Sequence, residues 1–309
     1  MLATVRQARP EYLLLSLGCV AVNMIGKAVR WKILMHTPGA NIKTQKIFLV
    51  LTVGQMLNWV YPARAGDLAR AYLLGNSSIE RSYMLGTVLL EKLIDILAFG
   101  FCVLLLVAFM PLPGWALNSV RLFLLVSLIF VITLLLIAQK QQALMAFLQK
   151  VSSWLDERFA KSIHVTIIQS IQSGLQSLRL IYNRDLLIKA SLWTLVVWGT
   201  ALFTNQTALL AFRIALPLTT PLLLLILLQI GITLPSIPTR IGLFEYICIL
   251  ALAVFGISQP LALSYGLVLH GMVMLPIVFI GVIFSWRLGL PSRRQTSDLD
   301  TGDQEQSFR

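Results

Sequence analysis

The stretch YMLGTVLLEKLIDILAFGFCVLLLVAFM, residues 83–110, decides the class of fold. A helix needs about 20 predominantly apolar residues to cross the hydrocarbon core of a bilayer, and this stretch is longer than that. Its only charged residues are Glu91, Lys92 and Asp95, which all lie in its first half. Because charged side chains inside a membrane span are expensive, the stretch predicts a transmembrane helix that carries a functional polar cluster.

The rest of the chain has the same character. Of its 309 residues, 57% are hydrophobic and 12% are charged, and the mean hydropathy is +0.81. Soluble domains carry about 25% charged residues on average. The composition excludes a soluble enzyme, a secreted disulfide scaffold and a disordered chain, and it predicts an all-α polytopic membrane protein. Cysteine in apolar stretches usually serves as a small hydrophobe, so no function is assigned to Cys19, Cys102 and Cys248.

Further spans are expected at residues 120–138, 187–212 and 261–286, and a shorter one at 12–25. The shorter one is preceded by arginines, as in a signal peptide. No small-residue cleavage site follows it, so we expect it to remain as the first membrane helix, with its basic end at the interface.

Two other apolar regions are interrupted. Residues 47–74 are broken by Pro and Gly within 61–66, and residues 218–255 are broken by Pro and Gly within 235–242. Two short apolar pieces around such a break are typical of a re-entrant hairpin or a discontinuous helix. The sequence therefore predicts a helical bundle with two such hairpins.

Charge gives an orientation. Lys and Arg outnumber Asp and Glu by 25 to 13; in a membrane protein this excess indicates positively charged cytoplasmic loops, and no nucleic-acid partner is expected. The basic segment 139–186 has apolar residues at steps of three and four, which predicts amphipathic helices on the cytoplasmic surface, either structural or for docking a partner. The polar tail 289–309 is expected to be disordered and cytoplasmic. With both hairpins re-entrant, the first opens from the cytoplasm and the second from the far side, as in an inverted repeat.

A short motif recurs at the two breaks. PARAGD, residues 62–67, and PTRIG, residues 238–242, share the pattern Pro-x-Arg-x-Gly. Proline ends one half-helix, and glycine lets the backbone turn so that the next half-helix presents free N–H groups. Together with Arg64 and Arg240, these groups predict an anion site suited to phosphate, which the planar guanidinium binds bidentately. The alternative is that both arginines reach out to lipid headgroups.

The acids inside the span at 83–110 share one helix face. Glu91 and Asp95 are four residues apart, and Lys92 is placed to pair with Asp95. Pairing of either acid with Arg64 on another helix is a second expectation. Such residues form a functional cavity, or alternatively a structural cluster of ion pairs.

Other polar residues are expected near this cluster. Asp67 and Glu245 follow the two glycines, where they either cap new helices or hold the arginines in place. When His270 is shifted back by the interval between the two motifs, it falls between Glu91 and Asp95. It is either a proton-sensitive member of the cavity or an ordinary buried histidine. Asn58 precedes the first break and is expected to line the cavity.

Motifs for a metalloprotease, a serine hydrolase and an ATPase are all missing from the sequence. No metal site, cofactor or catalytic residue is predicted.

Three motifs together resemble a known family: Asn58-x3-Pro62-x-Arg64-x-Gly66-Asp67-x2-Arg70, Glu91-Lys92-x2-Asp95 and Pro235-x2-Pro238-x-Arg240-x-Gly242-x2-Glu245. They are similar to the lysylphosphatidylglycerol-synthase-type transmembrane family, also called flippase-like membrane proteins, over about residues 20–288. In the family the middle motif usually reads Glu-Arg-x-x-Asp, and Lys92 replaces the arginine here. The last motif often has two adjacent glycines where Thr239 and Arg240 stand.

The resemblance implies lipid translocation. In bifunctional members this membrane domain moves aminoacylated phosphatidylglycerol between leaflets, and a soluble C-terminal domain makes that lipid. Here we expect a stand-alone member without the synthase domain. Its parts would be one flippase-like transmembrane domain, residues 1–288, which includes the segment 139–186, and the tail 289–309.

The leading hypothesis is a non-enzymatic flippase or transporter in the cytoplasmic membrane, with several spans and a cytoplasmic C-terminus. Its substrate would be an anionic phospholipid, a polyprenyl-phosphate type lipid or a lipid-linked headgroup. The residues expected to bind the phosphate or headgroup are Arg64, Arg240, Lys92, Asn58, Gly66 and Gly242. Those expected to pair charges or couple transport to protons are Asp67, Glu91, Asp95, Glu245 and His270.

Two alternatives stay open. One is an accessory membrane subunit of a lipid-linked glycosyltransferase or of an envelope-lipid pathway. The other is an intramembrane lipid-modifying enzyme that uses Glu91 or Asp95 as a base. The partner expected besides lipid is a second copy of the chain, or a glycosyltransferase or synthase.

Overall fold

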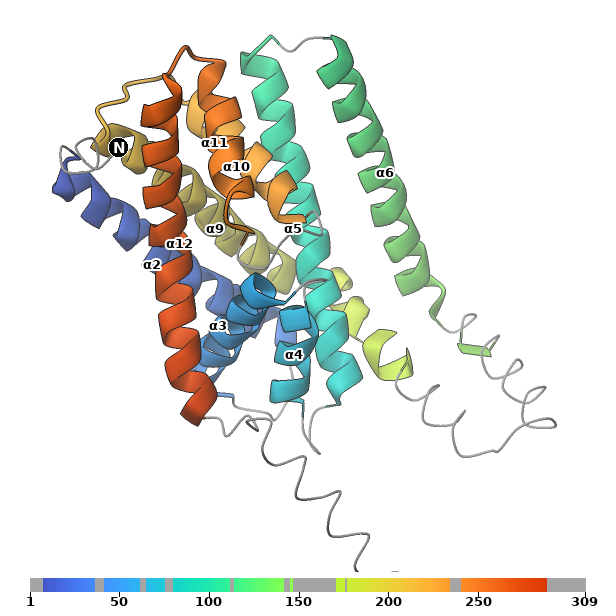
Figure 1. The fold of residues 1–309 in the computed structure, drawn as a ribbon. Helices are drawn as coiled ribbons and strands as arrows, with labels where there is room; N and C mark the ends of the chain where they lie inside the picture. Colours follow the sequence, from blue (N-terminus) through green and yellow to red (C-terminus); the bar gives the residue numbers. More distant parts are fainter. Residues whose placement is uncertain are drawn as a thin grey trace, which may run out of the picture.

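The structure is a computed structural model that describes residues 8–36, 42–61, 65–75, 80–111, 114–141, 145–146, 171–175, 177–233 and 240–287. These residues contain helices and no strands (Figure 1). The helices are α2 (Pro10–Met35), α3 (Thr44–Val60), α4 (Ala65–Leu74), α5 (Arg81–Phe109), α6 (Gly114–Gln139), η2 (Arg179–Tyr182), α9 (Arg184–Ala211), α10 (Thr219–Thr233), α11 (Leu243–Ala253) and α12 (Gln259–Arg287).

Five of these helices, α2, α5, α6, α9 and α12, are long and apolar enough to cross a membrane. The prediction of an all-α protein with several membrane spans is thereby confirmed. One expectation was wrong: the first span was predicted to end near residue 25, but α2 continues to Met35. Lys27 and Arg30 therefore lie within the helix instead of beyond its end. The charge of Arg30 does not end the span because carboxylates on α5 compensate it, as described below.

The two interrupted regions each form a pair of short helices. With 10 and 11 residues, α4 and α11 are too short to span the hydrocarbon core. In the first pair, α3 and α4 cross so closely at Gly54 and Gly66 that a Cβ on Gly66 would collide with the Gly54 carbonyl. The α3–α4 pair lies in the lower half of the bundle and the α10–α11 pair in the upper half (Figure 1). Residues 62–64 and 234–239, which include parts of both predicted breaks, lie outside the described residues, as do most of the segment 139–186 and the whole tail 289–309.

The order of helices occurs twice. A long helix, two short helices and a long helix form the series α2–α5, and α9–α12 repeat this series with similar lengths. The offset between counterparts is nearly constant, because the first series begins its helices at positions 10, 44, 65 and 81 and the second at 184, 219, 243 and 259. The first helices of the two series pack antiparallel: Ser16 Oγ donates to the Thr204 carbonyl at 3.1 Å, and Asn23 Nδ2 donates to the Val197 carbonyl at 2.6 Å.

Each series has its own apolar core. One buried cluster comes from α2–α5 and includes Trp31, Ile47 and Met84. The largest comes from the second series and includes Leu209 and Tyr265. A third cluster, drawn from α2, α3 and α12, joins the two series. Side chains of both series therefore face one another in the middle of the bundle.

Candidate functional site

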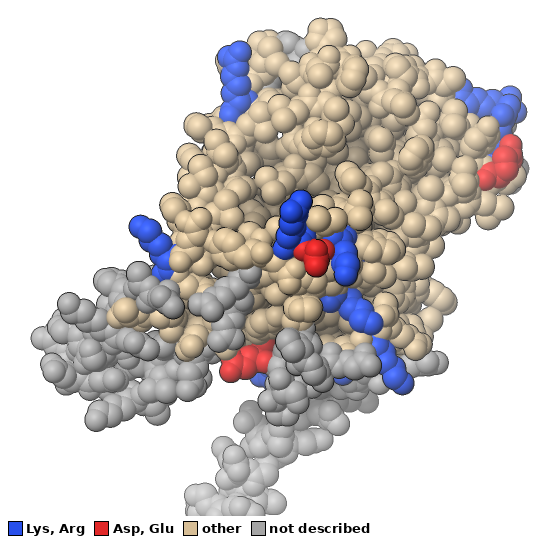
Figure 2. Space-filling model, turned by 180° about the vertical axis from the view of Figure 1, so that it is seen from behind, with Lys and Arg blue, Asp and Glu red and all other residues tan. Residues whose placement is uncertain are grey.

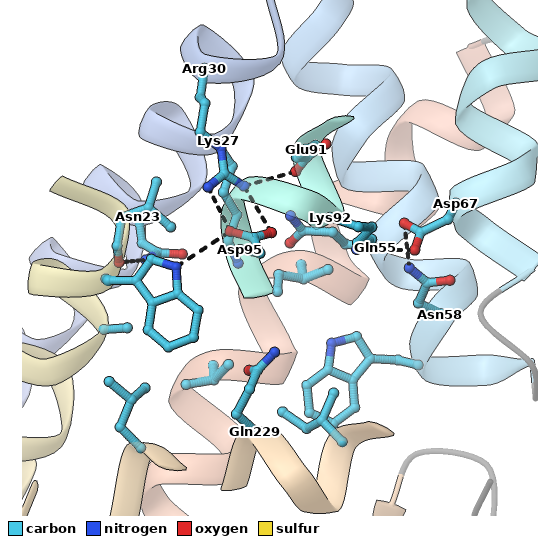
Figure 3. A pocket seen from close by; sticks show the side chains of 18 of the residues that line it. Asn23, Lys27, Arg30, Gln55, Asn58, Asp67, Glu91, Lys92, Asp95 and Gln229 are labelled. Atoms are coloured by element: carbon cyan, nitrogen blue, oxygen red, sulfur yellow. Dashed lines mark hydrogen bonds and ion pairs between the residues drawn. The ribbon is translucent and has the colours of Figure 1, made fainter. Parts of the chain in front are cut away.

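A cavity of about 230 Å³ lies between the two series (Figure 3). Its walls come from α2, α3, α4, α5, α9, α10 and α12, together with the turn that precedes α11. Asp95 and Trp198, which line it, stand at the midpoints of α5 and α9. The cavity is therefore at mid-height of the spans, far from either end of the long helices. Its polar and charged lining consists of Asn23, Lys27, Arg30, Gln55, Asn58, Asp67, Arg70, Glu91, Lys92, Asp95, Gln229 and Arg240, with the indoles of Trp59 and Trp198.

Arg30 is the centre of a buried ion network. Its guanidinium donates to both carboxylate oxygens of Asp95, at 2.6 and 3.1 Å, and to Glu91 Oε1 at 3.0 Å. It also donates to Thr194 Oγ1 at 3.2 Å, and the residue is 1% exposed. The indole N–H of Trp198 donates a further hydrogen bond to Asp95 Oδ1 at 3.3 Å. A bidentate, charge-assisted arrangement of this kind fixes the geometry of α2 against α5 and α9.

The network continues to α4. Arg70 Nη1 lies 2.8 Å from the second oxygen of Glu91, and its Nη2 lies 3.5 Å from Asp67. Lys92 Nζ lies 3.1 Å from Asp67 Oδ2, and Asp67 Oδ1 accepts a hydrogen bond from Asn58 Nδ2 at 3.2 Å. All three carboxylates of the pocket are thus paired with cations, and α3, α4 and α5 are joined through them.

The pocket nevertheless has an excess of positive charge. Among the described residues that line it, five are Lys or Arg and three are Asp or Glu, so the formal charge of this lining is +2. Among the described residues, no carboxylate lies within 4.0 Å of Lys27 Nζ. Arg240 has φ of 56°, donates from Nη2 to the Asn58 carbonyl at 3.2 Å, and lies over the Trp59 ring at 4.9 Å. Because a net charge is costly in a low-dielectric region, the positive excess of the described lining favours an anionic occupant.

Apart from Gln229, the opposite wall of the pocket is apolar. In Figure 3 the labelled charged side chains lie above Gln229 of α10. The apolar lining consists of Val197, Ala201, Leu225, Ile232, Val273 and Ile277. In the space-filling view, one group of charged side chains lies in the middle of a largely uncharged surface, and the others lie toward the edges of this face (Figure 2). Within the described ranges, no three His, Cys, Asp or Glu residues are grouped so that they could hold a metal ion.

A second acid–base pair lies outside the lining of the pocket. Glu245 Oε1 is 2.7 Å from His270 Nδ1, and Glu245 Oε2 accepts the N–H of Gly242 at 2.7 Å. Gly242 has φ of 89°, so it supplies the left-handed turn that starts α11. The N–H expected to be free for an anion is thus bonded to a carboxylate of the same chain. Gly66 allows α3 and α4 to cross, and it does not line the pocket either.

The structure brings together six of the predicted site residues at the pocket: Asn58, Asp67, Glu91, Lys92, Asp95 and Arg240. Gly66, Gly242, Glu245 and His270 do not line it. Arg64 lies outside the described residues.

The predicted pairing of Lys92 with Asp95 was wrong. Arg30 takes both oxygens of Asp95, and Lys92 turns toward Asp67 on α4 instead. The partners of Glu91 in the described chain are Arg30 and Arg70.

Sequence reasoning missed the contribution of α2 to the pocket. Asn23 lies at the end of the predicted first span, and Lys27 and Arg30 lie beyond it, yet all three line the cavity. Their steps of four and three residues place them on one face of a helix whose other charged residues, Glu11 and Lys32, lie in its first and last turns. That spacing was the available signal.

The fold and pocket define the class: a helical membrane protein with several spans and a charged cavity at mid-height between two similar series of helices. The family model described as "Lysylphosphatidylglycerol synthase TM region" matches residues 1–281. The chain belongs to this family. It is also similar to the protein named "UPF0104 membrane protein MJ1595" of Methanocaldococcus jannaschii, with 26% identity over 184 residues. That alignment covers 57% of this chain and 54% of the relative, so the chain spans about half the length of the relative that it matches. No solved structure matches the chain.

Proposed function

We propose that this protein moves a phosphate-bearing, anionic lipid across the membrane, and that the pocket binds the lipid headgroup. The observation that carries the proposal is the formal charge of +2 on a pocket at mid-height of the spans. A phosphodiester headgroup would reduce this charge, and one with a phosphomonoester would reduce it further. Membership of a family named for lysylphosphatidylglycerol synthase supports a lipid as the substrate.

Two cations are proposed to receive the phosphate. Lys27 is suited to this role because no carboxylate of the described chain is within ion-pair distance of it. Arg240 is suited because it enters the pocket from the turn before α11, with its guanidinium held over the Trp59 ring. Arg64, the equivalent of Arg240 in the first Pro-x-Arg-x-Gly motif, is proposed from the sequence to be a third. The paired residues Arg30, Arg70 and Lys92 would raise the local positive potential and keep the walls in place.

The lipid tails are proposed to follow the apolar wall. Side chains of α9, α10 and α12 supply that wall, so an acyl or polyprenyl chain could stay in contact with apolar groups while the headgroup is in the pocket. Both an anionic phospholipid and a polyprenyl-phosphate type lipid meet this description. The same chemistry applies to either, namely a phosphate joined to an apolar chain.

Access from the two sides is proposed to come from an inverted repeat. The series α2–α5 and α9–α12 repeat with a nearly constant offset, and their first helices are antiparallel. Their short helix pairs lie in opposite halves of the bundle (Figure 1). We propose that these pairs are re-entrant hairpins open to opposite sides of the cytoplasmic membrane, with the C-terminus in the cytoplasm. Rocking of one series against the other would then expose the pocket to each side in turn.

The test is lipid movement in vesicles that contain the purified protein. Fluorescent phosphatidylglycerol is the anionic probe, equally labelled phosphatidylcholine is the zwitterionic comparison, and a membrane-impermeant reductant bleaches only the outer leaflet. The wild type should make inner-leaflet phosphatidylglycerol accessible faster than it does phosphatidylcholine. Arg240→Gln and Lys27→Gln should each slow this movement at least tenfold, since each removes a full charge from the binding site.

Lys189→Gln is the matched control, because Lys189 lies on the exposed side of α9 and does not line the pocket. It should transport like the wild type. Wild-type vesicles that behave like protein-free vesicles, or normal transport by both pocket variants, would contradict the proposal.

A further inference from the structure

The repeat places two acid–base pairs at equivalent positions. The interval from the start of α4 to the start of α11 equals the interval from the start of α5 to the start of α12. The same interval relates Asp67 to Glu245, and Lys92 to His270. Each acid is in the first turn of a short helix, and each base is on the long helix that follows. The Lys92–Asp67 distance is 3.1 Å and the His270–Glu245 distance is 2.7 Å. The second series thus has the same contact as the first, with histidine in place of lysine.

The second pair is more deeply buried than the first. The side chains of His270 and Glu245 are 5% and 7% exposed, whereas that of Lys92 is 33% exposed. The imidazole stacks on Phe244 at 4.5 Å and on Trp59 at 5.3 Å between ring centroids. Its Nε2 is buried and has no hydrogen-bond partner among the described residues. The stacking contacts therefore fix the position of the ring, while Nε2 makes no hydrogen bond to a described residue.

The exchange of lysine for histidine changes what the pair can do. A lysine–aspartate pair keeps its proton near neutral pH, so its charges are fixed. Imidazole is the side chain whose ordinary charge change falls between pH 5 and 8. When His270 is protonated, the pair is neutral overall; when it has released the proton, Glu245 leaves a net charge of −1. The pair can thus take up and release one proton, with no other change in bonding.

We propose that the His270–Glu245 pair is a proton-binding site, and that its occupancy raises the affinity of the pocket for an anionic lipid. This inference rests on the proposed function. Trp59 connects the two sites, because its ring stacks on His270 at 5.3 Å and lies beneath the guanidinium of Arg240 at 4.9 Å. A single indole therefore separates the imidazole from a cation that is proposed to bind the phosphate.

The sign of the coupling follows from charge. One added positive charge within about 10 Å of the phosphate site should raise anion affinity about tenfold at an effective dielectric constant near 20. By linkage, lipid binding must raise the proton affinity of the pair by the same factor. The other groups that face the pair act as a constant background. They are Cys248 on α11, which interacts with Glu245, the neutral indole of Trp59 on α3, and Arg240 before α11 on the other side of that indole.

The chain suits a direct test, because it contains three histidines. Histidine-labelled wild type in zwitterionic nanodiscs would be titrated by NMR from pH 5 to 8, with His270 assigned through His270→Gln. The titration is repeated with dioctanoyl phosphatidylglycerol and with dioctanoyl phosphatidylcholine. We expect His270 to titrate, and its midpoint to rise by about one pH unit with phosphatidylglycerol alone, which is the tenfold factor above. Exposed His36, at the end of α2, is the internal control and should not shift.

A second variant tests the role of the proton in transport. His270→Lys recreates the fixed pair of the first series, so the variant should transport phosphatidylglycerol with the same rate across this pH range. Wild-type transport should instead fall as the pH rises.

The possible failures are distinct. A His270 that keeps one charge state throughout, or a midpoint unmoved by phosphatidylglycerol in a protein that transports this lipid, overturns the inference and leaves the proposed function intact. A His270 that titrates in a protein that neither binds nor moves phosphatidylglycerol overturns the proposed function, and the coupling with it.

Discussion

Replacing Arg30 by methionine should destabilise the protein by about 3–5 kcal/mol, the usual cost of removing one partner from a buried ion pair. Arg30 is 1% exposed and makes three charge-assisted hydrogen bonds, to Glu91 and to both oxygens of Asp95. The substitution affects the two acids differently. Glu91 keeps Arg70 at 2.8 Å, whereas the partner that Asp95 keeps in the described chain is the Trp198 indole at 3.3 Å. Most of the loss should therefore come from Asp95.

A double-mutant cycle separates this contribution from the loss of packing. Unfolding free energies would be measured in mixed micelles for Arg30→Met, Asp95→Asn and the double variant. Because Asp95→Asn removes the carboxylate that Arg30→Met leaves unpaired, the double variant should be more stable than Arg30→Met by about 1–2 kcal/mol. If Arg30→Met stays within about 1 kcal/mol of the wild type, or if the two substitutions are simply additive, Arg30 does not hold the network together as the structure indicates.

Two further predictions concern the first series of helices. Gly66→Ala should lower the melting temperature by several degrees, because its Cβ would collide with the Gly54 carbonyl where α3 crosses α4; Gly18→Ala, with no atom within 4 Å of the new Cβ, should melt like the wild type. Lys92→Gln should slow transport of labelled phosphatidylglycerol, yet change the unfolding free energy by less than about 1 kcal/mol, because Lys92 is one-third exposed and its pair with Asp67 is partly screened. Equal melting of the two glycine variants, or unaltered transport by Lys92→Gln, would count against these roles.

Hydropathy was sufficient to predict the spans and the two interrupted regions, because the length of an apolar run directly reflects the thickness of a bilayer. The end of α2 was predicted wrongly for a related reason. A count of apolar residues places the end of a span at Lys27 and Arg30. Such a count does not consider that a charged residue can form an ion pair with a residue on another helix. In the structure Arg30 is compensated by Glu91 and Asp95, which lie far along the chain on α5.

The partners within the site were predicted less well than its members. Helical spacing identifies neighbours on one helix, and it led to the expectation that Lys92 pairs with Asp95. The observed partner, Asp67, is on α4, and its position depends on the close crossing of α3 and α4. The two motifs fall between the short helices of each pair, at residues that the structure describes only in part. The structure adds that Asp67 and Glu245 each contact a base on the following long helix.

The most direct test of the central claim, that the pocket binds a lipid phosphate, is native mass spectrometry of detergent-extracted protein. The wild type would be compared with Lys27→Gln/Arg240→Gln and with the control Lys189→Gln. We predict that the wild type and the control retain the same anionic lipid, and that the double variant loses it while keeping the wild-type melting temperature within a few degrees. Equal retention of that lipid by all three proteins would contradict the account.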